Sequence, residues 1–358
     1  MKQKGVEKRR LRLWQAGLLL AALWFALAGC SGSPQGSGSA GEPEAPAPAD
    51  TMGETEPPAA ESAEPVSLRI ARQSGPSTSL IYVAAEEGLF EKHGAEVEVV
   101  SFASSRESVE ALLAGQLDMT FGSAQVLLTN AVNTGNLIAL GAVSQSPSDQ
   151  KVVAIRETVE NPGALKGKKV GVTSGTSSEY VMDLFLSRAG LVKGQDVEYL
   201  PVEPPETVAL MQRGDIAAFS LWEPHGSNAL QSMGEKAGIA ATAGEMGYRS
   251  TIYMLVKKEG LEEKAEAYQR VMAALREAST YMKENMEESA AIVAEATQLQ
   301  PEEVLPMLES SRQEMFADET AAEEIVNLGA WMAEKGIIPK APDSASEFLD
   351  TSLLEALP

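Results

Sequence analysis

From residue 66 onward, the apolar positions of the chain alternate between two spacings. The runs "VSLRIA" (66–71) and "AEVEVVSF" (95–102) have the short apolar pattern of strands. Between them, "SLIYVAAEEGLF" (79–90) has apolar positions at helical spacing, and Gly88 predicts its end. The repetition of this strand-and-helix unit predicts an α/β fold with a largely parallel sheet.

The same alternation continues to about residue 258, and from Gly260 onward the pattern is mostly helical. "SSRESVEALLAGQ" (104–116) predicts a helix with Ser104 or Ser105 as its N-cap and Gly115 as its stop. Strand, turn and helix follow one another in two further segments, "LDMTFGSAQVLLTNAVNTG" (117–135) and "KKVGVTSGTSSEYVMDLFLSRAG" (168–190). The remaining predicted strands are "LIALGAVS" (137–144), "DVEYLPV" (196–202), "IAAFSLWEP" (216–224) and "STIYMLVKK" (250–258).

At three places a predicted strand runs into a predicted helix through small hydroxylated residues. These turns are "SGPSTS" (74–79), "GSA" (122–124) and "SGTSS" (174–178). The first amides of a helix lack intrahelical partners and carry a partial positive charge, so such turns can bind an anion. Each turn alone is more simply explained as a plain N-cap. Because the carboxyl ends of neighbouring parallel strands share one edge, three such turns in one chain predict a common ligand cleft.

The first 65 residues differ in composition from the rest. A basic block (2–12) precedes an apolar run from about Ala16 to Gly29, which is the layout of an export signal. A transmembrane helix is the alternative, but spanning a bilayer takes about 20 apolar residues and this run is shorter. The only cysteine, Cys30, ends a "LAGC" sequence that resembles a bacterial lipobox, which implies cleavage before Cys30 and a lipid on its sulfur. Residues 31–65 are Gly, Ser, Pro, Ala and Glu with few apolar positions, which predicts a disordered linker.

Charge and motif content exclude several classes of function. The chain has 51 acidic and 29 basic residues and a net charge of −22, which repels phosphate backbones and argues against nucleic-acid binding. The two histidines, His93 and His225, are far apart, and there is no "HExxH", Cys-x-x-Cys pair or P-loop. The sequence therefore predicts no catalytic residues, no metal site and no cofactor.

Several segments, in order and spacing, resemble the nitrate, sulfonate, taurine and thiamine-precursor group of ABC-transporter solute-binding proteins. They are "IYVAAEEGLFEKHGAEVEVV" (81–100), "ALLAGQLDMTFGSA" (111–124), "LKGKKVGVTSGTSSEYVMDLFLSRAGL" (165–191), "DVEYLPV" and "VALMQRGDIAAFSLWEP" (208–224). The resemblance implies a two-lobe type II periplasmic-binding-protein fold whose lobes close over a ligand in the cleft between them. It implies hinge strands near Val152 to Ile155 and Ile252 to Val256, and a helical C-terminal part. The implied organisation is 1–29 signal peptide, 30–65 lipid-anchored disordered linker, 66–158 plus 250–358 lobe one, and 159–249 lobe two.

The resemblance also implies ligand-binding residues, which lie in the three turns, at the end of "LGAVS" and in "WEPH" (222–225). Trp222 would offer a flat apolar wall, Glu223 an acceptor for an amine or ring nitrogen, and His225 a polar lid. A core aromatic residue and a surface residue at a helix start are the alternatives for Trp222 and His225. The candidates are Ser77, Thr78, Tyr82, Gly122, Ser123, Ala124, Ser144, Ser174, Gly175, Thr176, Trp222, Glu223 and His225.

The function that follows is that of an exported monomeric receptor, anchored through the lipid on Cys30 to the outer face of the cytoplasmic membrane or to another periplasmic-side membrane. It would deliver a small-molecule ligand to ABC permease and ATPase subunits. A sulfonate- or taurine-like anion or zwitterion is the first expectation. No basic residue is clearly in the cleft, so an anion would rest mainly on amides and hydroxyls unless Arg106 or Arg249 reaches it. A thiamine-precursor-like pyrimidine or other heterocycle is the alternative. An enzyme or sensor on this fold is less expected, because the cysteine cluster of the fungal pyrimidine-forming enzyme is missing.

Overall fold

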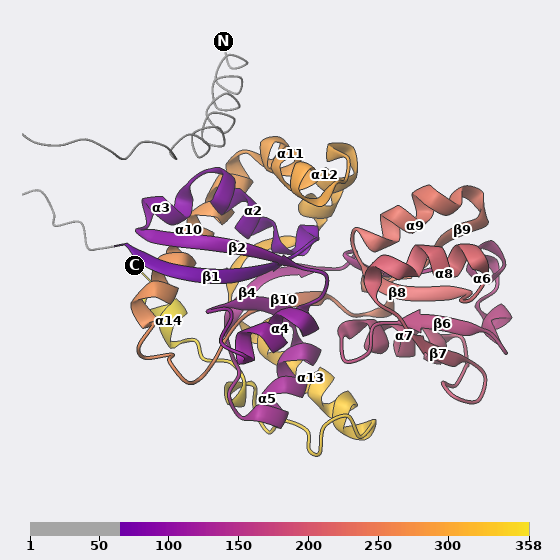
Figure 1. Cartoon of the computed structure of the whole chain (residues 1–358). Helices are drawn as coiled ribbons and strands as arrows, with labels where there is room; N and C mark the ends of the chain where they lie inside the picture. Colours follow the sequence, from indigo (N-terminus) through magenta and orange to yellow (C-terminus); the bar gives the residue numbers. More distant parts are fainter. Residues whose placement is uncertain (1–64, 358) are drawn as a thin grey trace, which may run out of the picture. The chain divides into compact units, whose positions relative to one another are not determined.

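The computed structural model describes residues 65–357. The predicted signal peptide, Cys30 and nearly all of the predicted linker lie outside these residues. No helix within 65–357 is long and apolar enough to cross a membrane. The described part holds two groups of strands, each with its own helices, which we call lobe one and lobe two (Figure 1).

Lobe one contains a parallel strand pair and a four-stranded sheet of order β11-β4-β10-β3. An isolated bridge between Ile70 and Met119 joins the two, and Ala71 N donates to Met119 O at 3.0 Å, so they form one continuous layer. The strands are β1 (Val66–Gln73), β2 (Ala95–Phe102), β3 (Thr120–Ser123), β4 (Ile138–Ser146), β10 (Ser250–Val256) and β11 (Arg312–Phe316).

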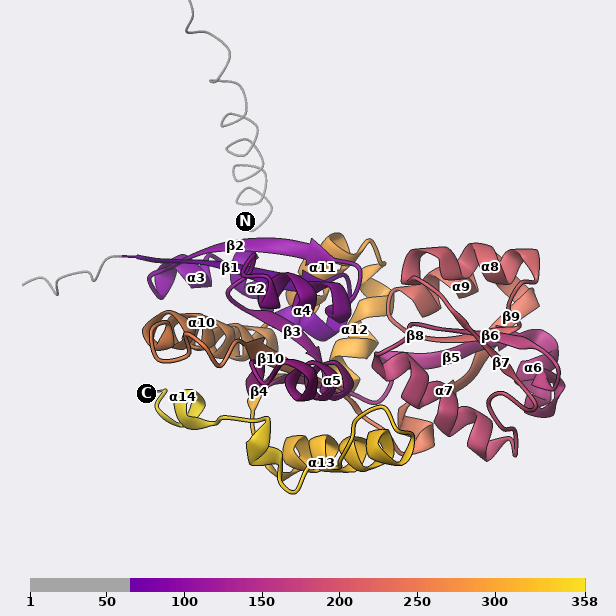
Figure 2. The same cartoon turned by 60° about the horizontal axis from the view of Figure 1, so that its bottom comes forward.

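Helices cover both faces of the lobe-one layer (Figure 2). Successive residues of β10 point to opposite faces, as in any strand. Met254 and Val256 pack with the α2 and α10–α12 side, whereas Tyr253 and Leu255 pack with α4, α5 and α13. The helices are α2 (Ser79–Glu86), α3 (Leu89–Lys92), α4 (Ser105–Leu113), α5 (Ala124–Thr134), α10 (Ala265–Glu284), α11 (Met286–Thr297), α12 (Pro301–Ser310), α13 (Glu319–Glu334) and α14 (Ser352–Glu355).

Lobe two is a five-stranded sheet of order β7-β6-β8-β5-β9 with helices on both faces. Val152 and Ala154 of β5 pack with α7, whereas Val153 packs with α8 and α9 on the other face. The strands are β5 (Gln150–Ile155), β6 (Lys169–Val172), β7 (Glu198–Pro201), β8 (Ala218–Trp222) and β9 (Ala237–Thr242), and the helices are α6 (Arg156–Glu160), α7 (Ser177–Arg188), α8 (Thr207–Arg213) and α9 (His225–Met233).

Short 3-10 helices occur in both lobes of the described chain. One of them, in the turn after β1, leads directly into α2. Their bounds are η1 (Pro76–Thr78), η2 (Pro162–Leu165), η3 (Pro204–Glu206), η4 (Gly234–Lys236), η5 (Gly244–Met246) and η6 (Ala345–Glu347).

The prediction of a largely parallel sheet was wrong, because three of the four strand pairs in lobe one and two of the four in lobe two are antiparallel. The chain crosses between the lobes at β4 to β5 and returns at β9 to β10, and β5 and β10 run antiparallel to their neighbours. The structure also puts β5 in the sheet of lobe two, whereas the sequence analysis placed its residues in lobe one. Strands β9 and β11 lie in segments where no strand was predicted.

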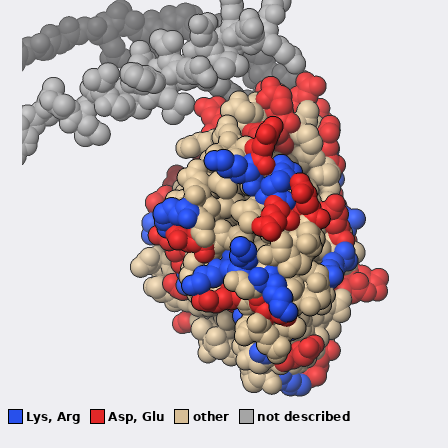
Figure 3. All heavy atoms as spheres, turned by 90° about the vertical axis from the view of Figure 1, so that its right-hand side faces the viewer, with Lys and Arg blue, Asp and Glu red and all other residues tan. Residues whose placement is uncertain are grey.

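The described surface mixes charges of both signs. On the face drawn in Figure 3, on the side of lobe two, Lys and Arg side chains lie beside Asp and Glu side chains. Exposed ion pairs occur in lobe two, such as Arg213 with Asp215 at 2.8 Å. No continuous basic field covers this face.

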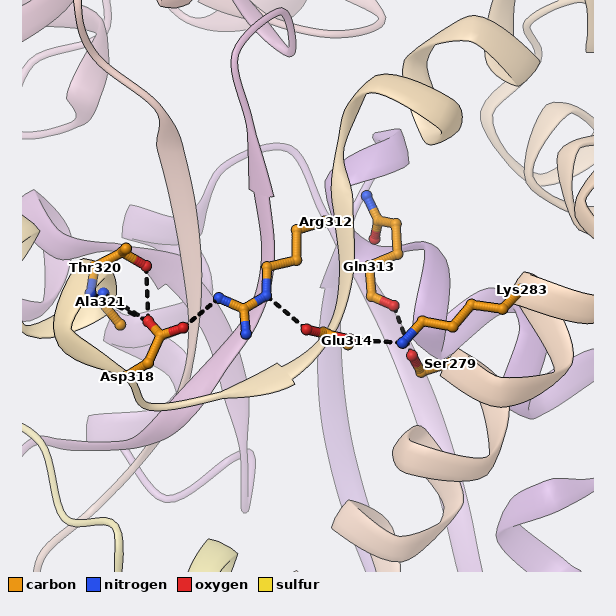
Figure 4. A network of polar contacts seen from close by, with 8 residues as sticks. All are labelled: Ser279, Lys283, Arg312, Gln313, Glu314, Asp318, Thr320 and Ala321. Atoms are coloured by element: carbon orange, nitrogen blue, oxygen red, sulfur yellow. Dashed lines mark hydrogen bonds and ion pairs between the residues drawn. The ribbon is translucent and has the colours of Figure 1, made fainter.

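The edge strand β11 is held by polar contacts on both sides (Figure 4). Arg312 donates to Glu314 at 2.7 Å and to Asp318 at 2.6 Å, and Lys283 of α10 donates to Glu314 at 2.6 Å. Hydrogen bonding to Lys283 holds the pKa of Glu314 below its usual value. Ser279 also donates to the carbonyl of Gln313 at 2.8 Å. These contacts fix β11 beside β4, next to the strands that lead into lobe two.

Candidate functional site

The carboxyl ends of strands from both lobes meet at a small cavity of about 30 Å³. This volume is far below the roughly 300 to 1,000 Å³ of a typical ligand pocket, so a solute enters only when the lobes or the lining move apart. The lining combines residues from lobe one, from lobe two and from the crossover between β4 and β5. They are Gln73, Ser77, Ser105, Ser123, Asp149, Ser177, Trp222, Ser250 and Ile252.

The first predicted turn contributes Ser77 to this cavity. Hydrogen bonds from residues next to Ser77 and from β4 hold the turn in place. Thr78 donates to Gln73 O at 3.1 Å, and the Tyr82 hydroxyl donates to the same carbonyl at 2.8 Å. Ser144, which is fully buried, donates to Ser77 O at 2.7 Å. The structure therefore places Ser77 on the cavity and gives Thr78, Tyr82 and Ser144 partners inside lobe one.

The second predicted turn presents Ser123, the N-cap residue of α5. Its side chain makes no capping hydrogen bond, and its Oγ is buried without a hydrogen-bond partner. The flanking Gly122 and Ala124 are also buried, and a Cβ at Gly122 would meet Ser105 Cβ at 3.1 Å. Buried hydroxyls are normally hydrogen-bonded, whereas Ser123 is a lining residue whose hydroxyl is left without a partner among the described residues.

The third predicted turn contributes Ser177, the first residue of α7, whereas the residues before it serve the turn itself. Thr176 caps α7 by accepting from Ser178 N at 3.3 Å. Gly175 donates its amide to Glu179 at 3.0 Å and has φ of +76°, which favours glycine. Ser174 is exposed. The cavity-facing hydroxyl is thus one residue beyond the three that were predicted.

In the "WEPH" segment, Trp222 lines the cavity, whereas Glu223 and His225 do not. Trp222 lines the cavity, and its ring makes an edge contact with His225 at 6.2 Å between centroids. Burial lowers the pKa of His225 to about 4, so the imidazole is neutral near pH 7. Glu223 is fully buried in an ion pair with Lys151 and accepts from Ser227 N at 3.0 Å. Its carboxylate is therefore occupied inside lobe two.

Asp149 was not predicted, yet it is the ionisable side chain among the cavity-lining residues of the described chain. It lies in the crossover from β4 to β5, where its amide donates to Ser146 Oγ at 3.0 Å and its carbonyl accepts from Glu223 N at 3.1 Å. It is 5% exposed, and its Oδ1 has no hydrogen-bond partner. Burial, and after it the nearby Glu223 carboxylate, raise its pKa while Lys151 opposes the rise, and together they bring the pKa to about 7.

The two lobes touch beside the cavity. Arg106, at the start of α4, donates to Glu203 of lobe two at 2.8 Å. A contact between Arg106 and the ligand stays a prediction. Arg249 is exposed and is not among the lining residues. A Cβ at Gly75 would lie 2.6 Å from Glu223 O, so the first turn approaches lobe two at a distance that only glycine allows.

Of the predicted ligand-binding residues, Ser77, Ser123 and Trp222 line the cavity. The ligand contacts themselves stay predictions for all thirteen candidates. Six further residues line the cavity and were not predicted to do so: Gln73, Ser105, Asp149, Ser177, Ser250 and Ile252. Ser177 belonged to a predicted turn, but nothing local distinguishes it from Thr176. No group of three or more His, Cys, Asp or Glu side chains suited to a metal occurs in residues 65–357.

The chain is similar in sequence to a known protein family and to several binding proteins. The model of the NMT1-like family matches residues 61–297. A protein of Brucella abortus (strain 2308) named as a binding protein is 29% identical over 218 residues, which are 61% of this chain and 67% of the relative. A protein of Escherichia coli (strain K12) named as an aliphatic sulfonates-binding protein is 28% identical over 240 residues, which are 66% of this chain and 73% of the relative.

A solved structure supports the fold. The structure of the alkanesulfonate-binding protein SsuA from Xanthomonas axonopodis pv. citri bound to MOPS matches with a TM-score of 0.69 at 21% identity, covering 80% of this chain and 99% of that chain. Other solved structures of periplasmic binding proteins match in the same way. The predicted two-lobe periplasmic-binding-protein fold is thereby confirmed.

Proposed function

The chain belongs to the NMT1-like family, and from this membership and the cavity between its lobes we propose that it is the solute-binding component of an ABC importer. It captures a small organic anion or zwitterion, sulfonate- or taurine-like, by closing its lobes over the solute. The observation that carries the proposal is one small cavity lined by residues of both lobes and by Asp149 of the crossover from β4 to β5. A ligand buried there binds the closed arrangement better than an open one, which is what drives closure.

The chemistry of the lining supports a polar solute. The cavity combines serine hydroxyls with the N-terminal turns of α5, which has 11 residues, and α7, which has 12. Helix N-termini attract negative charge, and hydroxyls donate or accept as the ligand requires. No lysine or arginine is among the lining residues that the structure describes, so an anionic group would rest on amides and hydroxyls.

The cavity carries no arrangement that supports catalysis. His225 makes its ring contact with Trp222 and is not a lining residue, and within the described chain no lining serine donates to a histidine. A nucleophilic serine needs an adjacent base within hydrogen-bond reach. We therefore infer that the protein binds its ligand without transforming it.

Delivery and anchoring are part of the same proposal. The "LAGC" sequence at Cys30 supports export and a lipid anchor on the outer face of the cytoplasmic membrane or another periplasmic-side membrane. The acidic residues of 31–65 support an extended tether. The receptor acts as a monomer and passes its ligand to separate permease and ATPase subunits.

A heterocycle such as a thiamine-precursor-like pyrimidine is the second candidate ligand. It is favoured by Trp222 at the cavity, since an indole face stacks on a flat ring. The unpaired Asp149 carboxylate would accept from a ring substituent.

A thermal-shift screen of the purified protein tests the proposal. The panel contains sulfonates, taurine, nitrate and aminopyrimidines. Ligand at about 100 times its dissociation constant stabilises the bound form by about 2.7 kcal/mol, which is several degrees for a protein of this size. We expect a saturable shift with one class that is lost in Ser177→Leu, which fills the cavity, and kept in Ser174→Leu, in the same turn but exposed. No shift with any class would overturn the proposed function.

A further inference from the structure

The cavity is lined by an acidic side chain with one carboxyl oxygen that has no hydrogen-bond partner among residues 65–357. Asp149 is 5% exposed and its Oδ1 accepts no hydrogen bond. Lys151, the cation that acts on it, is committed to a buried ion pair with Glu223. Glu223 in turn accepts from Ser227 N and Ser227 Oγ, both at 3.0 Å. The ion pair is satisfied within lobe two, and the Asp149 carboxyl faces the cavity without a donor.

An ionised carboxylate can only accept hydrogen bonds, and leaving one buried without a donor costs free energy. The neighbouring Ser123 hydroxyl, also without a partner, adapts to either role because its proton can rotate. An anionic group placed next to Asp149 would be repelled, whereas an ammonium or an N–H would supply the missing donor. Trp222 on the same cavity adds an aromatic face, to which cations are attracted.

We propose that Asp149 binds a hydrogen-bond-donating nitrogen of the ligand, so that the cleft selects amine-bearing solutes over nitrate or unsubstituted alkanesulfonates. This inference rests on the proposed function and narrows it to zwitterions and amino-substituted heterocycles. The ligand's acidic or polar end lies toward the N-terminal turns of α5 and α7, where Ser123 and Ser177 line the cavity. Its nitrogen lies at the crossover between β4 and β5.

The backbone around Asp149 holds the carboxyl in this place. Its amide donates to Ser146 of β4, and its carbonyl accepts from Glu223 at the end of β8. The residue is therefore attached to a strand of each lobe at the point where the chain crosses between them. A nitrogen bound there contacts the crossover itself, so its binding is coupled to lobe closure.

The protonation state of Asp149 provides a second test of amine binding. Burial raises the pKa of Asp149 to about 7, with Glu223 adding to the rise and Lys151 opposing it, so near neutral pH the carboxyl is partly protonated. An ammonium beside it favours the ionised form, and the proton leaves to solvent when the ligand binds. Amine binding is thus accompanied by proton release, and it weakens at pH 5, where Asp149 is protonated before the ligand arrives.

Matched pairs of probes test this inference by titration calorimetry. Taurine is compared with propane-1-sulfonate, in which a methyl group replaces the ammonium, and 4-aminopyrimidine is compared with 4-methylpyrimidine. The proteins are the unmodified chain, Asp149→Asn, and the control Asp215→Asn, which removes the same charge from an exposed site of lobe two. Each titration is repeated at pH 5 and pH 7.5, and at pH 7.5 in two buffers of different ionisation enthalpy.

We expect the amine-bearing probe of one pair to bind at least about tenfold more tightly than its partner at pH 7.5, a difference of about 1.4 kcal/mol. The preference shrinks at pH 5 and in Asp149→Asn, and it is kept in Asp215→Asn. Proton release, seen as a buffer-dependent enthalpy, disappears in Asp149→Asn. Should that variant fail to fold, the pH comparison on the unmodified chain decides alone.

Two results would overturn the inference, and they differ in what they leave standing. If propane-1-sulfonate binds as tightly as taurine at both pH values, the inference fails while the proposed sulfonate receptor stands. If no member of either pair produces heat with the folded protein, the inference fails together with the sulfonate and pyrimidine classes of the proposed function.

Discussion

Arg106 of lobe one donates to Glu203 of lobe two at 2.8 Å, and this contact exists only while the lobes are together. Their side chains are 39% and 49% exposed, so the pair lies in contact with water beside the cavity. An exposed ion pair contributes little to the stability of a lobe, about 0.2 to 1 kcal/mol at most sites. Its effect falls instead on the equilibrium between open and closed lobes, which sets the apparent affinity for ligand.

The first prediction follows from this pair. Glu203→Gln weakens taurine binding by about two- to fivefold, the equivalent of about 0.4 to 1 kcal/mol, and the loss becomes smaller at high salt. The urea midpoint changes little because each lobe keeps its own core. Titration calorimetry at two salt concentrations measures the effect. Asp343→Asn, which breaks the exposed Lys340–Asp343 pair inside lobe one, is the control and leaves affinity unchanged. Equal effects of the two variants would contradict a role in closure.

The second prediction separates stability from binding at Ser123. This side chain is 3% exposed and its Oγ has no partner, so Ser123→Ala removes an unsatisfied hydroxyl and stabilises the ligand-free protein by about 1 kcal/mol. The same change weakens ligand binding about tenfold, because the hydroxyl is available to the ligand. Ser289→Ala in α11, also buried and unpaired, stabilises equally but leaves binding unchanged. Urea unfolding and calorimetry report the two quantities, and unchanged binding in Ser123→Ala would refute the assignment.

Local signals were sufficient for most of the elements. Ser104 was one of two predicted N-caps, and it accepts from Glu107 N at 3.4 Å. Gly115, with φ of +76°, follows the end of the same helix. These features depend on backbone geometry within one turn, which the sequence expresses directly. Strand β5 was different, since its sheet partners β8 and β9 are more than 60 residues away and its apolar run fits either lobe.

The site was predictable only in outline, because it too depends on contacts between residues that are far apart in the sequence. The three turns were found from their hydroxylated residues, but whether Thr176 or Ser177 faces the cavity depends on the orientation of α7 against lobe one. Asp149 stands in "SPSDQK", which looks like an ordinary polar turn. Its burial comes from Glu223, 74 positions later, and from the packing of both lobes around the crossover. No pattern within a single segment could have shown it.

The third prediction concerns the buried pair of Lys151 and Glu223, which are 8% and 0% exposed at their side chains. Lys151→Met leaves the Glu223 carboxylate buried with only Ser227 as donor, and we expect a loss of about 3 kcal/mol or more in urea unfolding. The double change Lys151→Met with Glu223→Leu recovers much of this loss, because no buried charge remains. Lys340→Met, at an exposed pair, is the control. If the double variant is no more stable than Lys151→Met, the buried unpaired charge is not the cause of the stability loss.

The fourth prediction is the pH dependence that Asp149 gives to the ligand-free protein. Its folded pKa of about 7 lies above its ordinary value of 3.8, so the folded state binds more protons between these values and stability falls as pH rises through them. Asp149→Asn removes this loss, although Lys151 and Glu223 remain beside it. The free energy of unfolding of Asp149→Asn, relative to that of the unmodified protein, rises by about 2 kcal/mol from pH 5 to pH 8. Urea unfolding at both pH values, with Asp215→Asn as control, measures it; a constant difference would contradict the assignment.

The fifth prediction uses Gly75, where lobe one lies close to the backbone of lobe two. Its φ of −160° is ordinary extended backbone, so Gly75→Ala introduces no local strain. The added Cβ would lie 2.6 Å from Glu223 O, a carbonyl that cannot turn away as a side chain would, so the lobes have to stay further apart. We expect taurine affinity to fall at least about tenfold while the Tm of the ligand-free protein changes by less than about 2 °C. Ser74→Ala, at the exposed neighbour in the same turn, leaves both unchanged. Full affinity in Gly75→Ala would mean that binding does not require this approach of the lobes, and the closure described here would then not be the ligand-bound arrangement.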